Sequence, residues 1–166
     1  MKISAQEEYG LRCLIQMARR GAEQSLSIAE ISREEGLSVP NVAKLMRILR
    51  LGGLVCSVRG QAGGYALARP AQSITLDEVL QVLGGHFFGP QFCKLHTGTE
   101  RTCTHRGDCS MRLVWLKLQF LLSGVLARTS LQDLTRDEAQ MREWVESMFG
   151  DSLNAPKDTL AGATSI

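Results

Sequence analysis

Three cysteines, Cys93, Cys103 and Cys109, lie close together in a polar stretch of the sequence. Buried structural cysteines usually have apolar neighbours. The residues around these three are instead mostly charged residues or histidines: Lys94, His96, Glu100, Arg101, His105, Arg106 and Asp108. Polar loops that carry several thiols are typical sites for metal ions and iron–sulfur clusters. The trio therefore predicts that the loop over residues 86–109 binds an iron–sulfur cluster, of the two-iron or the four-iron type.

Two other interpretations of the three cysteines stay open. Zinc could be held by the three thiolates with His105 as the fourth ligand of a closed tetrahedral site, although the loop lacks the Cys-x-x-Cys pair typical of zinc. The thiols could also sense oxidants directly, without a metal. The remaining cysteines, Cys13 and Cys56, lie in a predicted helix and a predicted strand, and both are expected to be small core residues.

The helices that position these residues begin at recognisable caps. A capping box pairs an N-cap Ser or Thr with a Glu three residues later, and this pattern occurs at Ser4/Glu7, Ser27/Glu30, Thr75/Glu78 and Thr135/Glu138. Apolar residues at helical spacing then predict helices over residues 5–20, 28–35, 39–51, 76–83, 110–128 and 136–149.

Between the third and fourth of these helices the pattern changes to strand, glycine-rich turn and strand, over residues 54–68. Three helices, the last two joined by a tight turn, followed by a hairpin are typical of a winged helix-turn-helix. The predicted fold is therefore mainly α with a small β-hairpin wing, in which a winged helix-turn-helix domain precedes a long dimerisation helix.

The predicted domain has the charge distribution of a DNA reader. Residues 39–69 contain five basic residues and no acidic one, a bias that suits a phosphate backbone. The second helix of the motif enters the major groove with its N-terminal residues, and an arginine at the wing tip can enter the minor groove or clamp the backbone. The expected DNA-binding residues are Ser38, Val39, Pro40, Asn41, Lys44, Arg47, Arg59, Gly60, Gly63 and Gly64.

The helix predicted over residues 110–128 is more apolar than one small domain requires. Its apolar residues recur at three- and four-residue steps, at Met111, Val114, Trp115, Leu118, Leu121, Leu122 and Val125. A reader of palindromic DNA needs two copies of its domain, so we expect this helix to form a homodimer interface; packing against its own domain is the alternative.

The expected organisation has four parts. A DNA-binding domain over residues 1–70 is followed by a connecting helix and the cysteine loop over 71–109. The dimerisation helix and a terminal helix occupy residues 110–149. The small, polar and unpatterned residues 150–166 are expected to form a mobile tail.

The composition limits the classes of protein to which the chain can belong. With 44% hydrophobic residues and a net charge of +2 it is an ordinary soluble domain. It lacks an apolar stretch long enough to span a bilayer and a secretory signal, and its five cysteines are an odd number, unlike a disulfide framework. We therefore expect a cytoplasmic location and no membrane partner. No nucleotide-binding loop, nucleophile elbow or catalytic carboxylate pair occurs, so we do not expect an enzyme.

With these residues identified, the sequence resembles the Rrf2-type winged-helix regulators, which include the iron–sulfur regulator IscR, the nitric-oxide sensor NsrR and the iron regulator RirA. The resemblance covers about residues 1–135 and rests above all on the wing, Ser57-Val-Arg-Gly60 with Gly63-Gly-Tyr-Ala-Leu-Ala-Arg69, and on the three cysteines. Other matching stretches are Glu8-Tyr-Gly-Leu-Arg12, Ser27-Ile-Ala-Glu-Ile31, Leu51-Gly-Gly-Leu-Val55 and Ile74-Thr-Leu-Asp-Glu-Val79.

The resemblance implies a homodimeric regulator that binds a palindromic operator in double-stranded DNA and senses iron–sulfur status, redox state or nitric oxide. It implies Cys93, Cys103 and Cys109 as the cluster ligands and Arg59 as the minor-groove residue. One spacing departs from the family: nine residues separate Cys93 from Cys103, more than is common, whereas the five between Cys103 and Cys109 are usual.

The resemblance leaves the fourth ligand open. Arg112 stands where IscR-like relatives carry a histidine ligand, and a guanidinium that stays protonated cannot bind a metal. NsrR-like relatives use a carboxylate from the first helix of the partner subunit, and Glu8 stands at the matching position. His105 and His96 lie within the cysteine loop and are the other candidates.

Overall fold

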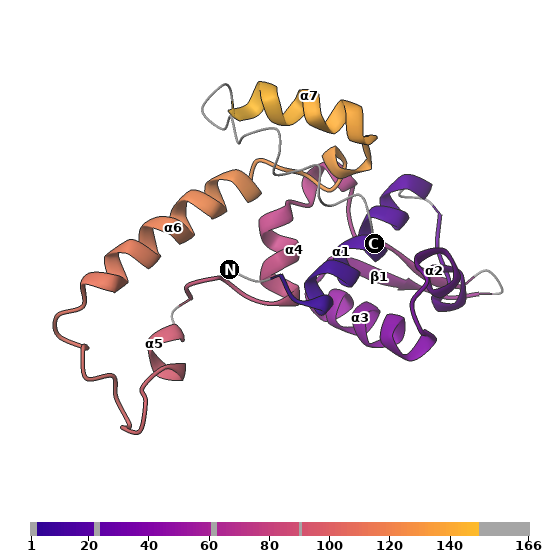
Figure 1. Cartoon of the computed structure of the whole chain (residues 1–166). Coiled ribbons are helices and arrows are strands. Elements are labelled where there is room, and N and C mark those ends of the chain that lie inside the picture. The colour runs from indigo at the N-terminus through magenta and orange to yellow at the C-terminus, as the bar shows by residue number, and fades with distance from the viewer. Residues whose placement is uncertain (1–2, 22–23, 61–62, 90, 150–166) are drawn as a thin grey trace. The chain divides into compact units, whose positions relative to one another are not determined.

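The computed structural model describes residues 3–21, 24–60, 63–89 and 91–149, and the tail expected over residues 150–166 lies outside them. The chain divides into two compact units, residues 1–135 and 136–166. The first unit contains the winged helix-turn-helix and the cysteine segment (Figure 1). Within the described residues, none of the helices combines the length and the apolar character that a bilayer span requires.

The first three helices are α1 (Ala5–Arg20), α2 (Ile28–Glu35) and α3 (Val39–Leu51). The capping boxes predicted for α1 and α2 are confirmed, because the hydroxyls of Ser4 and Ser27 accept from the backbone amides of Glu7 and Glu30 and both glutamates return the bond. The hydroxyl of Ser27 also lowers the pKa of the Glu30 carboxyl. The expected inner stripe of α3 is buried as well: Val42, Leu45, Met46 and Leu49.

The wing is an antiparallel hairpin of β1 (Val55–Val58) and β2 (Gly64–Leu67), in which Val55 pairs with Leu67 and Val58 with Gly64. The prediction that Cys56 is a core residue is wrong. Only the first residue of β1 is buried and Cys56 is exposed, because the two-stranded wing leaves the core immediately after Val55.

Gly64 lies where the wing touches the loop before α2. Leu26 and Tyr65 exchange backbone hydrogen bonds of 2.9 and 2.8 Å, and a Cβ on Gly64 would lie 2.3 Å from the carbonyl oxygen of Leu26. Because the obstacle is backbone, no rotamer change can relieve it.

We therefore expect Gly64→Ala to destabilise the folded protein by about 1–3 kcal/mol, as overpacking does. Urea unfolding followed by circular dichroism measures this loss as a lower midpoint. Gly107→Ala is the matched control, since a Cβ there meets no atom within 4 Å. Equal midpoints for the two variants would contradict the conclusion that the backbone of Leu26 leaves no room for a Cβ on Gly64.

The helix α4 (Leu76–Leu83) packs beside α1 and α3 and has the capping box predicted at Thr75 and Glu78. Glu78 also accepts a hydrogen bond of 2.8 Å from Arg69, the second residue after β2. Hydrogen bonds from the Thr75 amide, which has the larger effect, and from Arg69 hold the pKa of the Glu78 carboxyl below its usual value. The start of α4 is thus tied to the base of the wing.

The segment after α4 contains a short helix, α5 (Phe92–Leu95), that the sequence pattern did not predict, and then the long helix α6 (Ser110–Leu126). The latter ends two residues before the predicted end at 128. The chain turns back there because the buried Leu131 packs in the core and its amide donates to the carbonyl of Ile74, at 2.8 Å.

The second unit contains α7 (Glu138–Phe149). The capping box expected at Thr135 and Glu138 is wrong, because Thr135 belongs to a short 3-10 turn, Asp133–Thr135. Asp137 caps the helix instead: its carboxylate accepts from the Gln140 amide at 2.8 Å, and the Gln140 side chain accepts from the Asp137 amide at 3.4 Å.

Candidate metal centre and nucleic-acid interface

The N-terminal turn of α3 presents the predicted major-groove residues to solvent. Ser38 is the N-cap, and its side chain makes no capping bond. Val39, Pro40, Lys44 and Arg47 are exposed and Asn41 is partly exposed. Lys44 and Arg47 lie on the side of α3 opposite its buried stripe. The helix therefore offers one hydroxyl, one amide and two cations on a rigid surface.

The wing carries Arg59 at its exposed end. Gly60 has a φ of +121° and accepts a backbone bond of 2.9 Å from Gly63, while Gly63 and Gly64 leave no room for a Cβ. The predicted glycines thus shape the turn that presents Arg59.

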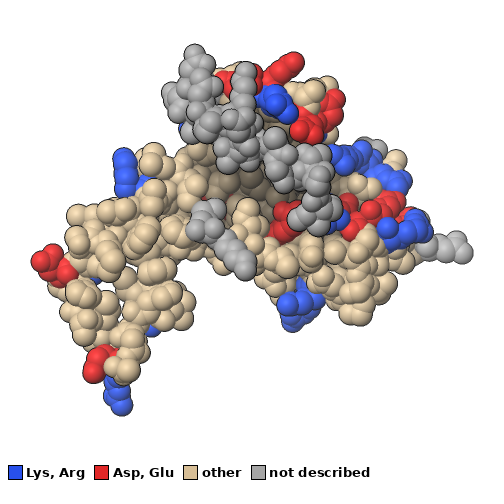
Figure 2. Space-filling view, viewed as in Figure 1, with Lys and Arg blue, Asp and Glu red and all other residues tan. Residues whose placement is uncertain are grey.

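Some basic side chains of the domain form ion pairs with carboxylates, and among the described residues the candidate DNA-binding ones do not. Arg69, counted in the basic segment, is paired with Glu78, and Arg12 and Arg20 are paired with Glu35 and Glu34. Within the described part of the chain, no ion pair involves Lys44, Arg47 or Arg59. In Figure 2 positive and negative side chains intermix over α1 and α2, and one positive group at the lower edge, below α3, has no negative neighbour on the face shown.

The three loop cysteines come together around one small cavity of about 120 Å³. Cys93 reaches it from α5, Cys109 from the residue before α6, and Cys103 from the loop between them. All three are partly buried. The other lining residues are mostly aromatic or apolar: Phe88, Phe92, His96, Met111, Arg112 and Trp115. Soft donors in an apolar, half-closed cavity suit an iron–sulfur cluster.

Arg112 adds a polar group to the same cavity. Its terminal nitrogen donates to the carbonyl of Arg106 at 3.0 Å, which ties the turn after Cys103 to α6. Its Nε–H is buried and has no hydrogen-bond partner among the described residues. Buried donors are nearly always bonded, so this orphaned N–H fits an anionic sulfur acceptor in the cavity.

The N-terminus of α6 carries a partial positive charge and so favours negative charge at the same point. Cys109 occupies the N-cap without a side-chain capping bond, and the first turn of α6 holds no acidic residue that would neutralise this charge. Within the described residues, no three His, Cys, Asp or Glu side chains are grouped to hold one metal ion. A zinc ion needs all its ligands within about 2.0–2.3 Å, whereas a four-iron cluster would bind each ligand through a different iron and a two-iron cluster would bind two ligands through each iron.

The candidates for a fourth ligand lie in different places. His96 lines the cavity and His105 does not. Glu8 is exposed on α1 and is not among the lining residues of the same chain. Cys13 is also remote from this cavity: it is fully buried in the core, where burial raises the pKa of its thiol to about 11. The expectation that Cys13 is a core residue is confirmed.

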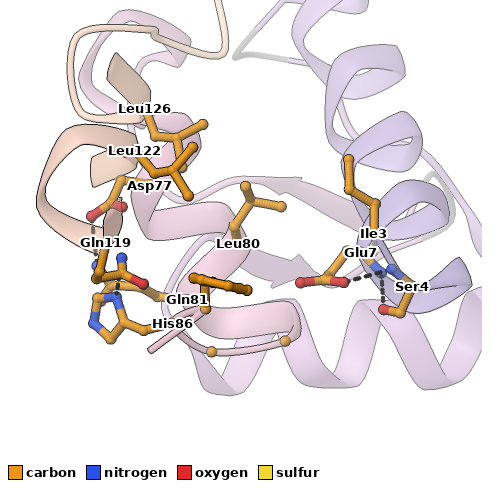
Figure 3. Close-up of a pocket in the computed structure, with 13 residues that line it drawn as sticks. Ile3, Ser4, Glu7, Asp77, Leu80, Gln81, His86, Gln119, Leu122 and Leu126 are labelled. Carbon is orange, nitrogen blue, oxygen red and sulfur yellow. Dashed lines mark hydrogen bonds between the residues drawn. The ribbon is translucent and has the colours of Figure 1, made fainter. Parts of the chain in front are cut away.

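A second cavity of about 330 Å³ lies between α1, α4 and α6 (Figure 3). On one side Gln119 donates to Ser123 at 2.9 Å, and Ser123 donates to Asp77 on α4 at 3.0 Å. The Gln119 side chain also accepts from the Phe88 amide at 2.9 Å. These bonds connect α4, α6 and the aromatic wall of the cysteine cavity.

Sequence reasoning missed the walls of the cysteine cavity. Phe88 and Trp115 are far apart in sequence and meet only in the fold. The place of His96 in the cavity wall carried one local signal, because His96 follows Cys93 by three residues, a spacing that places two side chains on one face of a helical turn.

Comparisons with known proteins agree with this architecture. The Rrf2 family model, described as "Iron-dependent Transcriptional regulator", matches residues 3–137. The chain is 34% identical over 138 residues to the protein rrf2 of Nitratidesulfovibrio vulgaris Hildenborough, which covers 82% of this chain and 89% of that protein. It is 30% identical over 154 residues to the HTH-type transcriptional regulator IscR of Cereibacter sphaeroides, covering 90% and 96% of the two chains.

A solved structure of CymR, the global cysteine regulator of B. subtilis, superposes with a TM-score of 0.64 at 30% identity, over 81% of this chain and 96% of that one. The helices and the hairpin wing of the described residues match the winged-helix regulators of this family. The chain therefore belongs to the Rrf2 family of transcriptional regulators.

Proposed function

We propose that this protein is a homodimeric regulator whose affinity for a palindromic DNA operator is set by an iron–sulfur cluster bound to Cys93, Cys103 and Cys109. The observation that carries the proposal is the shared cavity of the three thiols, with its aromatic walls and the orphaned Arg112 donor. A bound cluster would supply an iron centre that reacts with oxidants or nitric oxide. The iron-dependent description of the family supports the same assignment.

DNA recognition is assigned to α3 and the wing. Asn41 offers paired donor and acceptor groups to a base edge, Lys44 and Arg47 offer charge to phosphates or guanine, and Ser38, Val39 and Pro40 complete the leading turn. Arg59 reaches the minor groove or backbone from the turn made by Gly60, Gly63 and Gly64. The exposure of these side chains on one domain supports the assignment.

Dimerisation is assigned to α6. None of its residues is buried, although Val114, Leu118 and Leu121 are large apolar residues on one face, with exposed fractions of 56%, 39% and 53%. An exposed apolar surface of this kind marks a protein interface. A second copy is the occupant that a two-half-site reader requires.

The cavity is connected to the reading head by a continuous series of contacts. Cys109 begins α6, Ser123 of α6 bonds Asp77 of α4, and the adjacent Glu78 bonds Arg69 at the base of the wing. A change at the cavity that shifts α6 therefore acts on the element that supports the wing. This contact series is how we propose that cluster state alters DNA affinity.

Direct thiol sensing is the second candidate, because the similar protein CymR of Staphylococcus aureus has a solved structure described as its oxidized form and the three thiols form no single-ion site within the described residues. Purification without oxygen, followed by iron, sulfide and zinc analysis, separates the candidates. Near-equal iron and sulfide is the expected result. One zinc per chain, or neither metal after attempted reconstitution, would overturn the cluster proposal.

We expect Arg59→Ala to weaken binding about tenfold to a palindromic duplex selected from a random library by the protein itself. Loss of one backbone or minor-groove cation also reduces the slope of log affinity against log salt by about one. Fluorescence anisotropy at several salt concentrations measures both effects. The control is Arg142→Ala, which removes one charge from α7, where Arg142 pairs with Glu138. Equal losses in both variants would refute the wing assignment.

A further inference from the structure

We propose that His96 is the non-cysteine ligand of the cluster, through its Nε2 atom. This inference rests on the proposed function, because it concerns the same cysteine cavity. It assigns the fourth ligand to the chain that supplies the three thiols, rather than to the partner's first helix.

The position of His96 distinguishes it from the other histidines. It ends α5, three residues after Cys93, and lines the cavity together with all three loop cysteines. His86 lines the other cavity, where its Nδ1 lies 3.2 Å from the Gln119 amide nitrogen. His105 lines neither cavity. Of the three histidines, His96 alone lies beside the thiols.

The hydrogen bonding of His96 prepares Nε2 for a metal. Its Nδ1 lies 2.8 Å from the carbonyl oxygen of Phe92. A carbonyl only accepts, so Nδ1 carries the hydrogen, and in the neutral ring Nε2 then holds the lone pair. Histidine ligands typically donate their other N–H to a carbonyl or carboxylate in this way, which fixes both tautomer and orientation.

The ring of His96 is also held in place by packing. It stacks on Phe92 with a centroid distance of 4.1 Å and an interplanar angle of 19°, and Phe92 packs in turn on the buried Phe88 at 4.8 Å. A ligand supported by a hydrogen bond and a stacked ring loses little freedom on binding.

The alternative ligands are less well placed. Arg112 reaches the cavity but cannot ligate, and its orphaned Nε–H is suited to donate to a sulfur. Glu8 is exposed on α1 and could take part only across a dimer interface. His96 completes four ligands within one chain: three thiolates and a neutral imidazole.

An imidazole in place of a thiolate makes the site one unit less negative. In clusters where histidine replaces cysteine, the reduction potential is raised. Because His96 is exposed, an iron bound to it would be accessible to small reactive molecules. The proposed ligand therefore also identifies the iron at which oxidants or nitric oxide would react first.

Pulsed EPR of the dithionite-reduced holoprotein tests this assignment, with histidine labelled by ¹⁵N. We expect one strongly coupled histidine nitrogen in the wild type, its loss in His96→Ala and its retention in the matched variants His105→Ala and Glu8→Ala. If His96→Ala fails to retain a cluster, His96→Cys decides: iron and sulfide stay, the nitrogen coupling disappears and the reduction potential falls.

The outcomes separate this inference from the function on which it rests. A wild type with iron and sulfide but without a coupled nitrogen would overturn the His96 ligand and leave the cluster proposal intact. A histidine nitrogen coupling or a reduction potential that is unchanged in His96→Cys would also overturn the His96 ligand and leave the cluster proposal intact. A wild type without iron would overturn both.

Discussion

Replacing Cys103 by serine is expected to abolish stable cluster binding while the winged-helix domain stays folded. Cys103 lies in an irregular segment between α5 and α6 and outside the buried core, so its loss removes a ligand without disturbing packing. Loss of a partner outside the ligand set already lowers metal affinity by about 10- to 100-fold, and loss of a direct ligand should exceed that range. Iron and sulfide analysis after anaerobic reconstitution measures the change.

The matched control for this experiment is Cys56→Ser, which makes the same chemical change at an exposed position on β1, outside the cavity. Cys56→Ser should keep the iron and sulfide of the wild type. If both variants lost iron equally, the loss would be nonspecific. If neither did, Cys103 would not be a ligand.

The Cys103→Ser variant should still bind DNA, but its DNA affinity should no longer respond to the signal. The residues of α3 and the wing are unchanged, so the variant keeps an intact reading head. Its affinity for the selected duplex should no longer change on addition of oxidant or a nitric oxide donor. An undiminished response in Cys103→Ser, with no iron present, would instead favour thiol sensing through Cys93 or Cys109.

Most of the fold could be predicted because its signals are local. A capping box is specified by two residues three positions apart, and the pairs at Ser4, Ser27 and Thr75 all form. The buried stripe of α3 follows directly from helical periodicity. Where the local signal was ambiguous the prediction failed, since Thr135 and Asp137 both precede a polar side chain by three residues and the structure uses Asp137.

Other features depended on tertiary contacts that no local pattern contains. The four-residue helix α5 has an N-cap, Gln91, without a side-chain capping bond, so nothing in the sequence announces it. Cys56 resembles a core residue because it lies in an apolar strand. Whether Cys56 is buried depends on what packs against the sheet of the wing, and this sheet has only the two strands β1 and β2 within the described residues.

The cysteine trio could be predicted from composition, but the arrangement around it could not. Phe88 is brought to the thiols by a bond from its amide to Gln119, a residue 31 positions later. Arg112 could be excluded as a ligand from its chemistry alone, yet its buried and unbonded Nε appears only in the fold. The sequence left the fourth ligand open for the same reason, because the contacts of His96 with Phe92, on which the proposed ligand rests, depend on the unpredicted helix α5.

The largest effect on DNA affinity is expected from Leu121→Glu, which should convert the dimer to a monomer. Val114, Leu118, Leu121 and Val125 share the face of α6 opposite Gln119 and Ser123, which bond to the cysteine segment and α4. Leu121 is 53% exposed in one chain. In a two-fold interface the same side chain is buried twice, so each dimer loses two leucine contacts, worth about 1.5–3 kcal/mol each, and gains two carboxylates that resist burial.

Operator affinity should then fall by at least about 10²-fold, because two linked reading heads gain about 10²- to 10⁴-fold over one. Light scattering after size exclusion measures the mass, and anisotropy with the selected duplex measures the affinity. The control is Leu116→Glu, which makes the same substitution on the other side of α6 at a residue 47% exposed, and which should remain dimeric. A dimeric Leu121→Glu protein with wild-type affinity would place the interface elsewhere. A monomer with undiminished affinity would show that one head suffices, because the reading surface on α3 and the wing is untouched by either substitution.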